Sequence, residues 1–314
     1  MNILVGTSGF SYKEWKGRFY PEKLPADQML GYYSARFPTV EMNNTFYRMP
    51  TEKVLLDWAA EVPESFVFAV KAPQRITHIQ RLKEAGEETD YFLRTVNVLG
   101  ARLGPTLFQL PPNMKKDFGR LQGFLELLPD RWKAAFEFRN ASWYTDDVFE
   151  ALRARDFALA VADTGEEGDA PFVATASWGY LKLRRVEYEA SRLEKWAHDV
   201  KEQAWTDAYV YFKHEDEATG PRLAAEFASR VAGWAGGQHY YPPARQPAYP
   251  PIATSLLHCS SLAGTTDRRP MRTSPKSMNA ESALMAGSPT GFGSFFPARR
   301  FTTISLPPFA LGSG

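Results

Sequence analysis

Short apolar runs alternate with amphipathic stretches along the first 234 residues of the chain. Each run ends on polar residues, and most stretches between runs carry apolar residues at the spacing of a helix face. The runs predict strands over residues 3–8, 39–45, 67–72, 105–110, 134–139, 157–163, 179–184 and 208–214. Helices are expected over 26–37, 51–62, 89–99, 117–128, 145–155, 191–205 and 221–231, and a loop over 165–177.

This repeating pattern predicts the fold class. Eight strand–helix units in about 230 residues match the size of a (β/α)8 barrel. A doubly wound open sheet is the alternative, and it often carries a glycine-rich phosphate turn after its first strand. The segment Gly6–Gly9 is too short for the GxGxxG spacing of that turn. We therefore predict an α/β fold of the TIM-type barrel class.

The composition changes after Trp234. Residues 235–314 hold eleven of the 23 prolines, with seven basic and two acidic residues, and keep no helix or strand period. We predict a barrel domain over residues 1–234 and a disordered, basic tail over 235–314. Such a tail could contact nucleic acid or an acidic partner. It could equally be an unselected extension, or a stretch translated out of its original frame.

Charge and cysteine content indicate which partners and which cellular compartment to expect for the protein. The formal net charge is +1, so the overall charge of the chain does not predict binding to nucleic acid or to a membrane. The single cysteine, Cys259, cannot form an internal disulfide, which suits a reducing compartment. We find no secretory signal pattern and no apolar run near the ~20 residues of a membrane helix. The expectation is a cytoplasmic protein without membrane contact.

Polar residues gather where the predicted strands end. Strands of a parallel barrel are buried on both faces, so charged residues there need partners or a ligand. By alternation, eleven of these residues are expected to point into the barrel mouth, where barrel active sites lie. They are Glu41, Asn43, Lys71, Gln109, Glu137, Arg139, Asp163, Lys182, Arg184, Tyr211 and Lys213.

The charge of this set predicts an anionic ligand, because five of its members are basic and three are acidic. We expect Glu41, Glu137 and Asp163 to supply acid–base catalysis and the other eight residues to bind substrate. The leading hypothesis is a hydrolase-like enzyme for an anionic substrate, which could be phosphorylated or a nucleic acid. One alternative is a non-catalytic binder of an anionic metabolite. Another is a structural or partner-binding barrel whose charges only pair internally.

Other chemistry is less favoured by the residue pattern. His78 and His214 are candidate general bases, but no HxH or HExxH spacing predicts zinc. The three acidic members of the set could hold a divalent cation, although the nearby lysines compete for the same carboxylates. We therefore expect no cofactor and no metal. Glu41 and Glu137 could also be the acid and base of a glycosidase, if their separation allows.

Seven ordered segments carry a resemblance to a known family: GTSGFSYKEWKGRFYP, TVEMNNTFYRMP, FAVKAPQRITH, LGPTLFQLPP, AFEFRNASW, VADT and YVYFKH. Residues 2–233 resemble the YecE-like family (domain of unknown function 72). The resemblance implies a TIM-type barrel and no established reaction. The polar signature of the family falls on Thr7, Ser8, Glu41, Asn43, Lys71, Gln109, Glu137, Arg139, Ser142, Trp143, Asp163, Tyr211 and Phe212.

The seventh predicted strand departs from the family pattern. Family members often end it with Arg-Leu-His-Gly, whereas this chain has Lys182–Arg185, reading KLRR. The change places Arg184 where the family has histidine. It therefore removes a candidate general base and adds a fixed positive charge.

Overall fold

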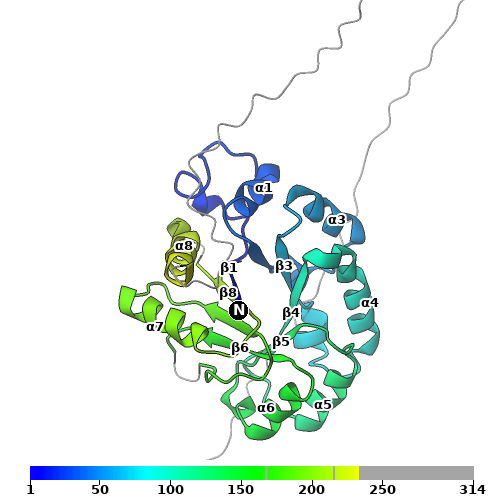
Figure 1. The fold of residues 1–314 in the computed structure, drawn as a ribbon. Helices are drawn as coiled ribbons and strands as arrows, with labels where there is room; N and C mark the ends of the chain where they lie inside the picture. Colours follow the sequence, from blue (N-terminus) through cyan, green and yellow to red (C-terminus); the bar gives the residue numbers. More distant parts are fainter. Residues whose placement is uncertain (167–168, 215, 233–314) are drawn as a thin grey trace, which may run out of the picture. The chain divides into compact units, whose positions relative to one another are not determined.

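Eight parallel strands form a closed barrel in the computed structural model, which describes residues 1–166, 169–214 and 216–232. Each strand pairs with its neighbours in sequence, and β1 pairs with β8 to close the ring (Figure 1). The predicted TIM-type barrel is confirmed. The strands are β1 (Asn2–Ser8), β2 (Thr39–Met42), β3 (Val67–Lys71), β4 (Leu103–Gln109), β5 (Ala134–Glu137), β6 (Ala158–Asp163), β7 (Gly179–Leu183) and β8 (Asp207–Phe212).

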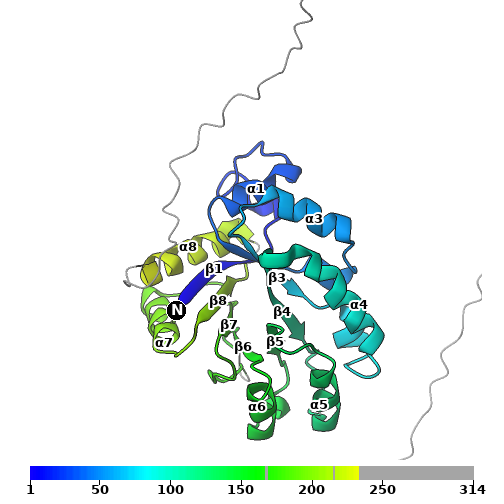
Figure 2. The same cartoon turned by 45° about the vertical axis from the view of Figure 1, so that its right-hand side comes forward.

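Helices surround the barrel, and α8 lies beside β1 (Figures 1 and 2). The α-helices are α1 (Met29–Ser34), α2 (Asn44–Tyr47), α3 (Glu52–Glu61), α4 (Gly86–Val96), α5 (Phe118–Glu126), α6 (Asp146–Arg153), α7 (Ala190–Lys201) and α8 (Thr219–Ala232). Shorter helical segments are Lys13–Trp15, Ala26–Gln28, Arg75–Ile79, Asn97–Arg102, Ala141–Trp143 and Asp216–Ala218. Among the residues described, every helix falls short of the length and apolar character that a membrane span requires.

Three strands end more than one residue before the predicted position, and one of them is the strand expected over 208–214, which stops at Phe212. The strand expected over residues 39–45 stops at Met42, because the chain turns at Asn43 into the short helix α2, which begins at Asn44. The strand expected over 134–139 stops at Glu137, which leaves Arg139 in the loop that follows. The expected loop over 165–177 holds no helix in its described residues. The predicted tail, residues 235–314, lies outside the described residues.

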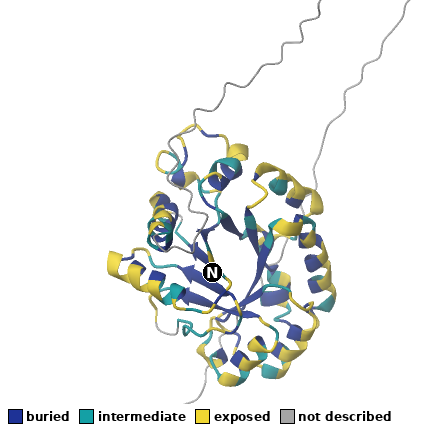
Figure 3. Ribbon diagram, viewed as in Figure 1, coloured by how far each residue is buried: buried dark blue, intermediate teal, exposed yellow. Residues whose placement is uncertain are grey.

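The apolar core has two parts, one inside the barrel and one between the barrel and its helices. The inner part is small and includes Leu4, Leu107, Tyr180, Tyr209 and Tyr211. The outer part is larger and consists of the alternate strand residues packed against the helices. Figure 3 shows this division, with buried strands surrounded by helices whose outer sides are exposed. The side chains that point inward from the strands therefore decide what the barrel mouth contains.

Candidate functional site

A layer of polar side chains fills the carboxyl end of the barrel. Glu41, Lys71, Gln109, Glu137 and Lys182 come from five different strands, and each is buried. Glu41 is 0% exposed and Glu137 is 1% exposed, so neither carboxylate has water as its main partner. The barrel thus brings together five of the residues that the sequence predicted to meet there.

Lys182 connects the two buried carboxylates. Its Nζ lies 3.2 Å from Glu41 Oε1 and 3.1 Å from Glu137 Oε2. Burial opposes the charge of Lys182, but the two carboxylates outweigh burial and raise its pKa. Glu137 Oε2 has no hydrogen bond of good geometry from the described residues, so its contact with Lys182 is mainly electrostatic. This group is therefore a buried ion triad that stays charged near neutral pH.

Glu41 is held by hydroxyl groups as well as by Lys182. It accepts hydrogen bonds from Ser8 Oγ and from the Tyr180 hydroxyl, the latter at 2.6 Å. Asn43 Nδ2 donates to Ser8 Oγ at 2.9 Å, which fixes the direction of that hydroxyl. Burial raises the pKa of Glu41, but Lys182 and the two hydroxyl donors lower it overall. A carboxyl that remains ionised is a poor general acid.

Lys71 differs from Lys182 because no carboxylate among the described residues lies within ion-pair distance of it. Its Nζ donates to Gln109 Oε1 at 2.8 Å and lies 4.1 Å from the centre of the Phe46 ring. Gln109 Nε2 donates in turn to Glu137 Oε1 at 2.7 Å. Burial, followed by the charge of Lys182, lowers the pKa of Lys71 to about 8.

Glu137 remains ionised because the cations around it outweigh its burial. Burial alone would raise its pKa, but Lys182, Lys71 and the other donors around it lower the pKa to about 2. Such a carboxylate is a weak base and does not donate a proton near neutral pH. The only charged layer residue with a pKa near the working range of most enzymes is therefore Lys71.

Cations line the rim above this layer. Arg184 Nη1 lies 3.8 Å from Glu137 Oε1, and Lys213 is half-buried just after β8. Arg139 is exposed, and its guanidinium makes no hydrogen bond or ion pair within the part of the chain that the structure describes. The pKa of His78 is lowered by burial and then by Lys71 and Arg139. Two titratable groups at the mouth, Lys71 and His78, are thus both shifted toward their neutral forms, first by burial and then by neighbouring cations.

The structure places Asp163 elsewhere, and its expected inward position is wrong. Asp163 accepts hydrogen bonds from Arg185 Nε at 2.5 Å, from Arg192 and from Trp196 Nε1 at 2.9 Å. Arg192 and Trp196 belong to α7, so Asp163 faces the helices, while Ala160 lies in the core inside the barrel. Its pKa is lowered because these donors outweigh burial. Without Asp163, five cations and two carboxylates remain at the mouth.

Two other expected residues have structural partners. The Tyr211 hydroxyl lies 2.8 Å from Thr39 Oγ1, and its ring packs 5.3 Å from that of Tyr180. Tyr211 is 0% exposed and belongs to the apolar core inside the barrel. His214 Nε2 lies 2.8 Å from the carbonyl oxygen of Arg184, an interaction that joins two loops. Within the described residues, no group of three or more metal-ligating side chains is arranged to hold an ion.

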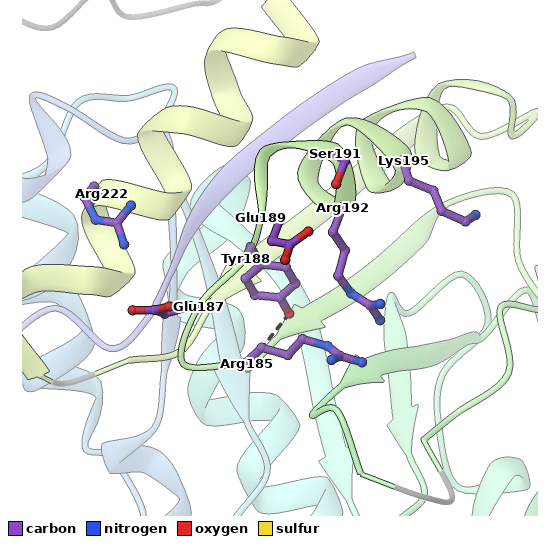
Figure 4. Close-up of a pocket in the computed structure, with 8 residues that line it drawn as sticks. All are labelled: Arg185, Glu187, Tyr188, Glu189, Ser191, Arg192, Lys195 and Arg222. Atoms are coloured by element: carbon purple, nitrogen blue, oxygen red, sulfur yellow. Dashed lines mark hydrogen bonds between the residues drawn. The ribbon is translucent and has the colours of Figure 1, made fainter.

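A cavity of about 880 Å³ lies apart from this layer, beside α7 and α8. Figure 4 shows its lining, which consists of Arg185, Glu187, Tyr188, Glu189, Ser191, Arg192, Lys195 and Arg222. Its four cations already have carboxylate partners. Arg185 and Arg192 pair with Asp163, Lys195 pairs with Asp199, and Arg222 pairs with Glu226. A ligand anion would have to compete with these carboxylates, so we take the barrel mouth as the candidate site.

Tyr180 and Phe46 belong to the site but are missing from the predicted set. Tyr180 lies two residues before Lys182 on β7, and the two side chains therefore point to the same face. The period of two residues that predicted the lysine could also have predicted the tyrosine. Phe46 comes from α2 and follows the predicted strand over residues 39–45 directly. Only the helix brings its ring over Lys71, and no signal in the sequence indicates that contact.

The comparisons with known proteins agree with this architecture. The family described as "Protein of unknown function DUF72" matches residues 4–247. The chain belongs to the DUF72 family. The match continues past residue 234, into the segment that we predicted to be the tail.

Curated relatives and solved structures are also similar to this chain. UPF0759 protein YunF of Bacillus subtilis is 27% identical over 230 residues, which cover 68% of this chain and 80% of that protein. UPF0759 protein YecE of Escherichia coli is 29% identical over 113 residues, covering 36% of this chain and 42% of that protein. A DUF72 family protein from Thermotoga maritima has a TM-score of 0.67 and 28% identity, covering 74% of this chain and 100% of the other. A second, from Enterococcus faecalis, has a TM-score of 0.61 and 20% identity, covering 74% and 98%.

Proposed function

We propose that this DUF72 protein is an enzyme that binds a small anionic substrate at the barrel mouth. The observation that carries the proposal is the excess of positive charge there. After burial, which is the larger cause, this charge lowers the pKa of both Lys71 and His78, which lie on different elements. An anion at the mouth would offset the repulsion between these cations. Its attraction to them would therefore contribute favourably to the free energy of ligand binding. In this proposal Arg139 and Arg184 bind the anion, because a guanidinium suits carboxylate or phosphate groups.

In this proposal the residues divide into binding and proton-transfer groups. Lys71 transfers the proton, because its pKa of about 8 lies near the operating range. Gln109 and Glu137 position Lys71 through two consecutive hydrogen bonds. Glu41 and Glu137, which we first expected to be acid and base, instead hold Lys182. Phosphorylated metabolites and nucleotides are the first ligands to test.

A structural barrel without a ligand is the competing proposal, and one observation favours it. Glu41, Glu137, Lys71 and Lys182 sum to zero charge, so the buried layer itself needs no anion. The three variants Lys71→Met, Glu137→Gln and Arg139→Met separate the proposals. If all three are more stable than the wild type and none loses ligand binding, the internally paired barrel is the better explanation.

Binding can be measured by thermal shift of the full chain with inorganic phosphate, phosphorylated metabolites and nucleotides. A ligand that binds only the folded state raises the unfolding temperature. We expect Arg139→Met to abolish the shift. Arg131→Met is the matched control, because Arg131 is also exposed but precedes β5, at the opposite end of the same strand. If the ligand raises the unfolding temperature equally in both variants, the mouth is not the binding site.

A further inference from the structure

The two buried lysines of the charged layer have different partners. Lys182 contacts two carboxylates, which keep it protonated. Lys71 has a neutral amide as its acceptor and a phenyl ring beside it. A buried lysine that is desolvated and close to another cation is the usual setting of a nucleophilic amine. The layer therefore contains one lysine suited to carry charge and one suited to react.

We propose that Lys71 is a nucleophile that forms an imine with an anionic aldehyde or ketone. This inference rests on the proposed function and names its substrate class: a keto acid, an aldehyde acid or a phosphorylated carbonyl compound. The rim cations Arg139 and Arg184 would bind the acid or phosphate group. The carbonyl carbon would then lie over the Lys71 amine.

The hydrogen bonds of Lys71 suit this role. A neutral amine has two N–H groups and one lone pair, and Gln109 Oε1 accepts one of the N–H groups at 2.8 Å. The Gln109 amide is oriented by its own donation to Glu137 Oε1. The amine is therefore held by a neighbour that leaves its lone pair available for attack. Gln109 is a positioning residue in this scheme.

The reaction conserves atoms and charge without an oxidant or a reductant. The Lys71 lone pair attacks the carbonyl carbon, and a proton from the amine moves to the carbonyl oxygen, which gives a carbinolamine. Uptake of one proton and loss of the oxygen as water leave a protonated imine. The Phe46 ring, 4.1 Å from Nζ, limits the access of water that would hydrolyse it.

The protonation of Lys71 gives the expected selectivity. Its pKa of about 8, against an ordinary value of 10.5, follows from burial and from Lys182 and Lys213, with Glu137 and Glu41 acting in the opposite direction. At pH 8 the neutral fraction is then roughly a hundredfold larger than that of an ordinary lysine. Lower basicity reduces the intrinsic reactivity of the amine, so we expect a preference of about tenfold.

Reductive trapping of the full chain tests the inference. The protein is incubated at pH 8 with glyoxylate, pyruvate or dihydroxyacetone phosphate and sodium cyanoborohydride, and the modified lysines are mapped by mass spectrometry. With at least one probe, we expect about tenfold more adduct on Lys71 than on the exposed Lys53 and Lys83. Lys182 should stay unmodified because its carboxylates keep it protonated. Equal or lower modification of Lys71 with every probe overturns the inference.

A variant and a non-reactive ligand make the result specific. Lys71→Arg keeps the positive charge but forms no imine, so its adduct at this position should disappear while its circular dichroism remains that of the wild type. Glycerol 3-phosphate has the phosphate but no carbonyl, and its binding is measured by thermal shift. If it binds in an Arg139-dependent manner and Lys71 is not trapped, the imine is wrong and the anion site stands. If neither binding nor trapping occurs, the proposed function fails as well.

Discussion

Lys182 and Glu41 face each other across the barrel, with 3.2 Å between Nζ and Oε1, although β7 and β2 are far apart in the sequence. Both side chains are almost completely buried. Neither charge could remain there alone, because an isolated buried ion loses its hydration without compensation. This contact, together with the one to Glu137, therefore sets how the protein responds to mutation at its centre.

The two buried lysines should respond oppositely to removal of their charge. Lys182→Met leaves the buried Glu41 without an ion-pair partner and leaves Glu137 with only the more distant Arg184, and we expect it to lower the free energy of unfolding by about 3–5 kcal/mol. Lys71→Met removes a cation that lacks a carboxylate partner and leaves one amide oxygen unsatisfied. These effects offset each other, so its stability should lie within about 1 kcal/mol of the wild type. Urea unfolding at pH 7 measures both, and equal losses would contradict the assigned pairing.

Acid should destabilise the protein partly through Glu137. Its pKa is about 2 in the folded protein against an ordinary value of 4.5, so the unfolded chain binds the proton first as the pH falls. The contribution of Glu137 to stability is therefore complete above about pH 4.5 and disappears as the pH falls toward 2. Urea unfolding of the wild type and Glu137→Gln across this range gives the comparison. The variant should lose stability less steeply, and parallel curves would refute the shifted pKa.

Raising the pH above 8 should increase the contribution of Lys71 to the stability of the protein. Its pKa is lowered to about 8 in the folded protein, while the unfolded chain keeps the ordinary value of 10.5. Between these values the unfolded state binds more protons, so the Lys71 contribution to stability rises with pH. The difference in unfolding free energy between the wild type and Lys71→Met should therefore move in favour of the wild type from pH 8 to 10. A constant difference would place the Lys71 pKa near its ordinary value.

Asp163→Asn tests the corrected position of that residue. The change weakens the bonds to Arg185, Arg192 and Trp196, and we expect a loss of about 1–3 kcal/mol in stability. Anion binding at the mouth should not change, because Asp163 faces α7. Thermal shift with and without ligand separates the two effects. If a folded Asp163→Asn protein loses ligand binding, Asp163 contributes to the binding site and the corrected position is refuted.

Two glycines provide a matched test of the packing between strands. A β-carbon at Gly6 would lie 2.1 Å from the carbonyl oxygen of Thr39, which is backbone and has little room to move. At Gly123 in α5, a β-carbon meets nothing within 4 Å. We expect Gly6→Ala to disrupt the β1–β2 pairing, and Gly123→Ala to stabilise the helix by about 1 kcal/mol. Thermal unfolding compares them, and a neutral Gly6→Ala would show that the barrel can widen there.

Much of the candidate site follows from strand alternation. Glu41, Glu137 and Lys182 were expected at the mouth because each alternates with large apolar neighbours, and those neighbours pack in the core against the helices. Asp163 was misplaced because it closes the apolar run ALAVAD of β6, where it shares a face with Leu159 and Val161 that packs toward the helices. Where both faces are apolar, alternation groups residues but does not say which group points inward. Tertiary contacts with Arg185 and Arg192 decide it.

The sequence by itself determined the eight strands, most of the helices between them, the barrel and most of the polar layer, because these depend on local periods of two and 3.6 residues. Only the tertiary structure decided which lysine is paired. Lys182 meets Glu41 and Glu137 because closure of the barrel places β2, β5 and β7 around one axis. Lys71 is left with Gln109 and Phe46 for the same reason. The reactivity of a buried charge depends on distances between strands, and a one-dimensional pattern does not contain those distances.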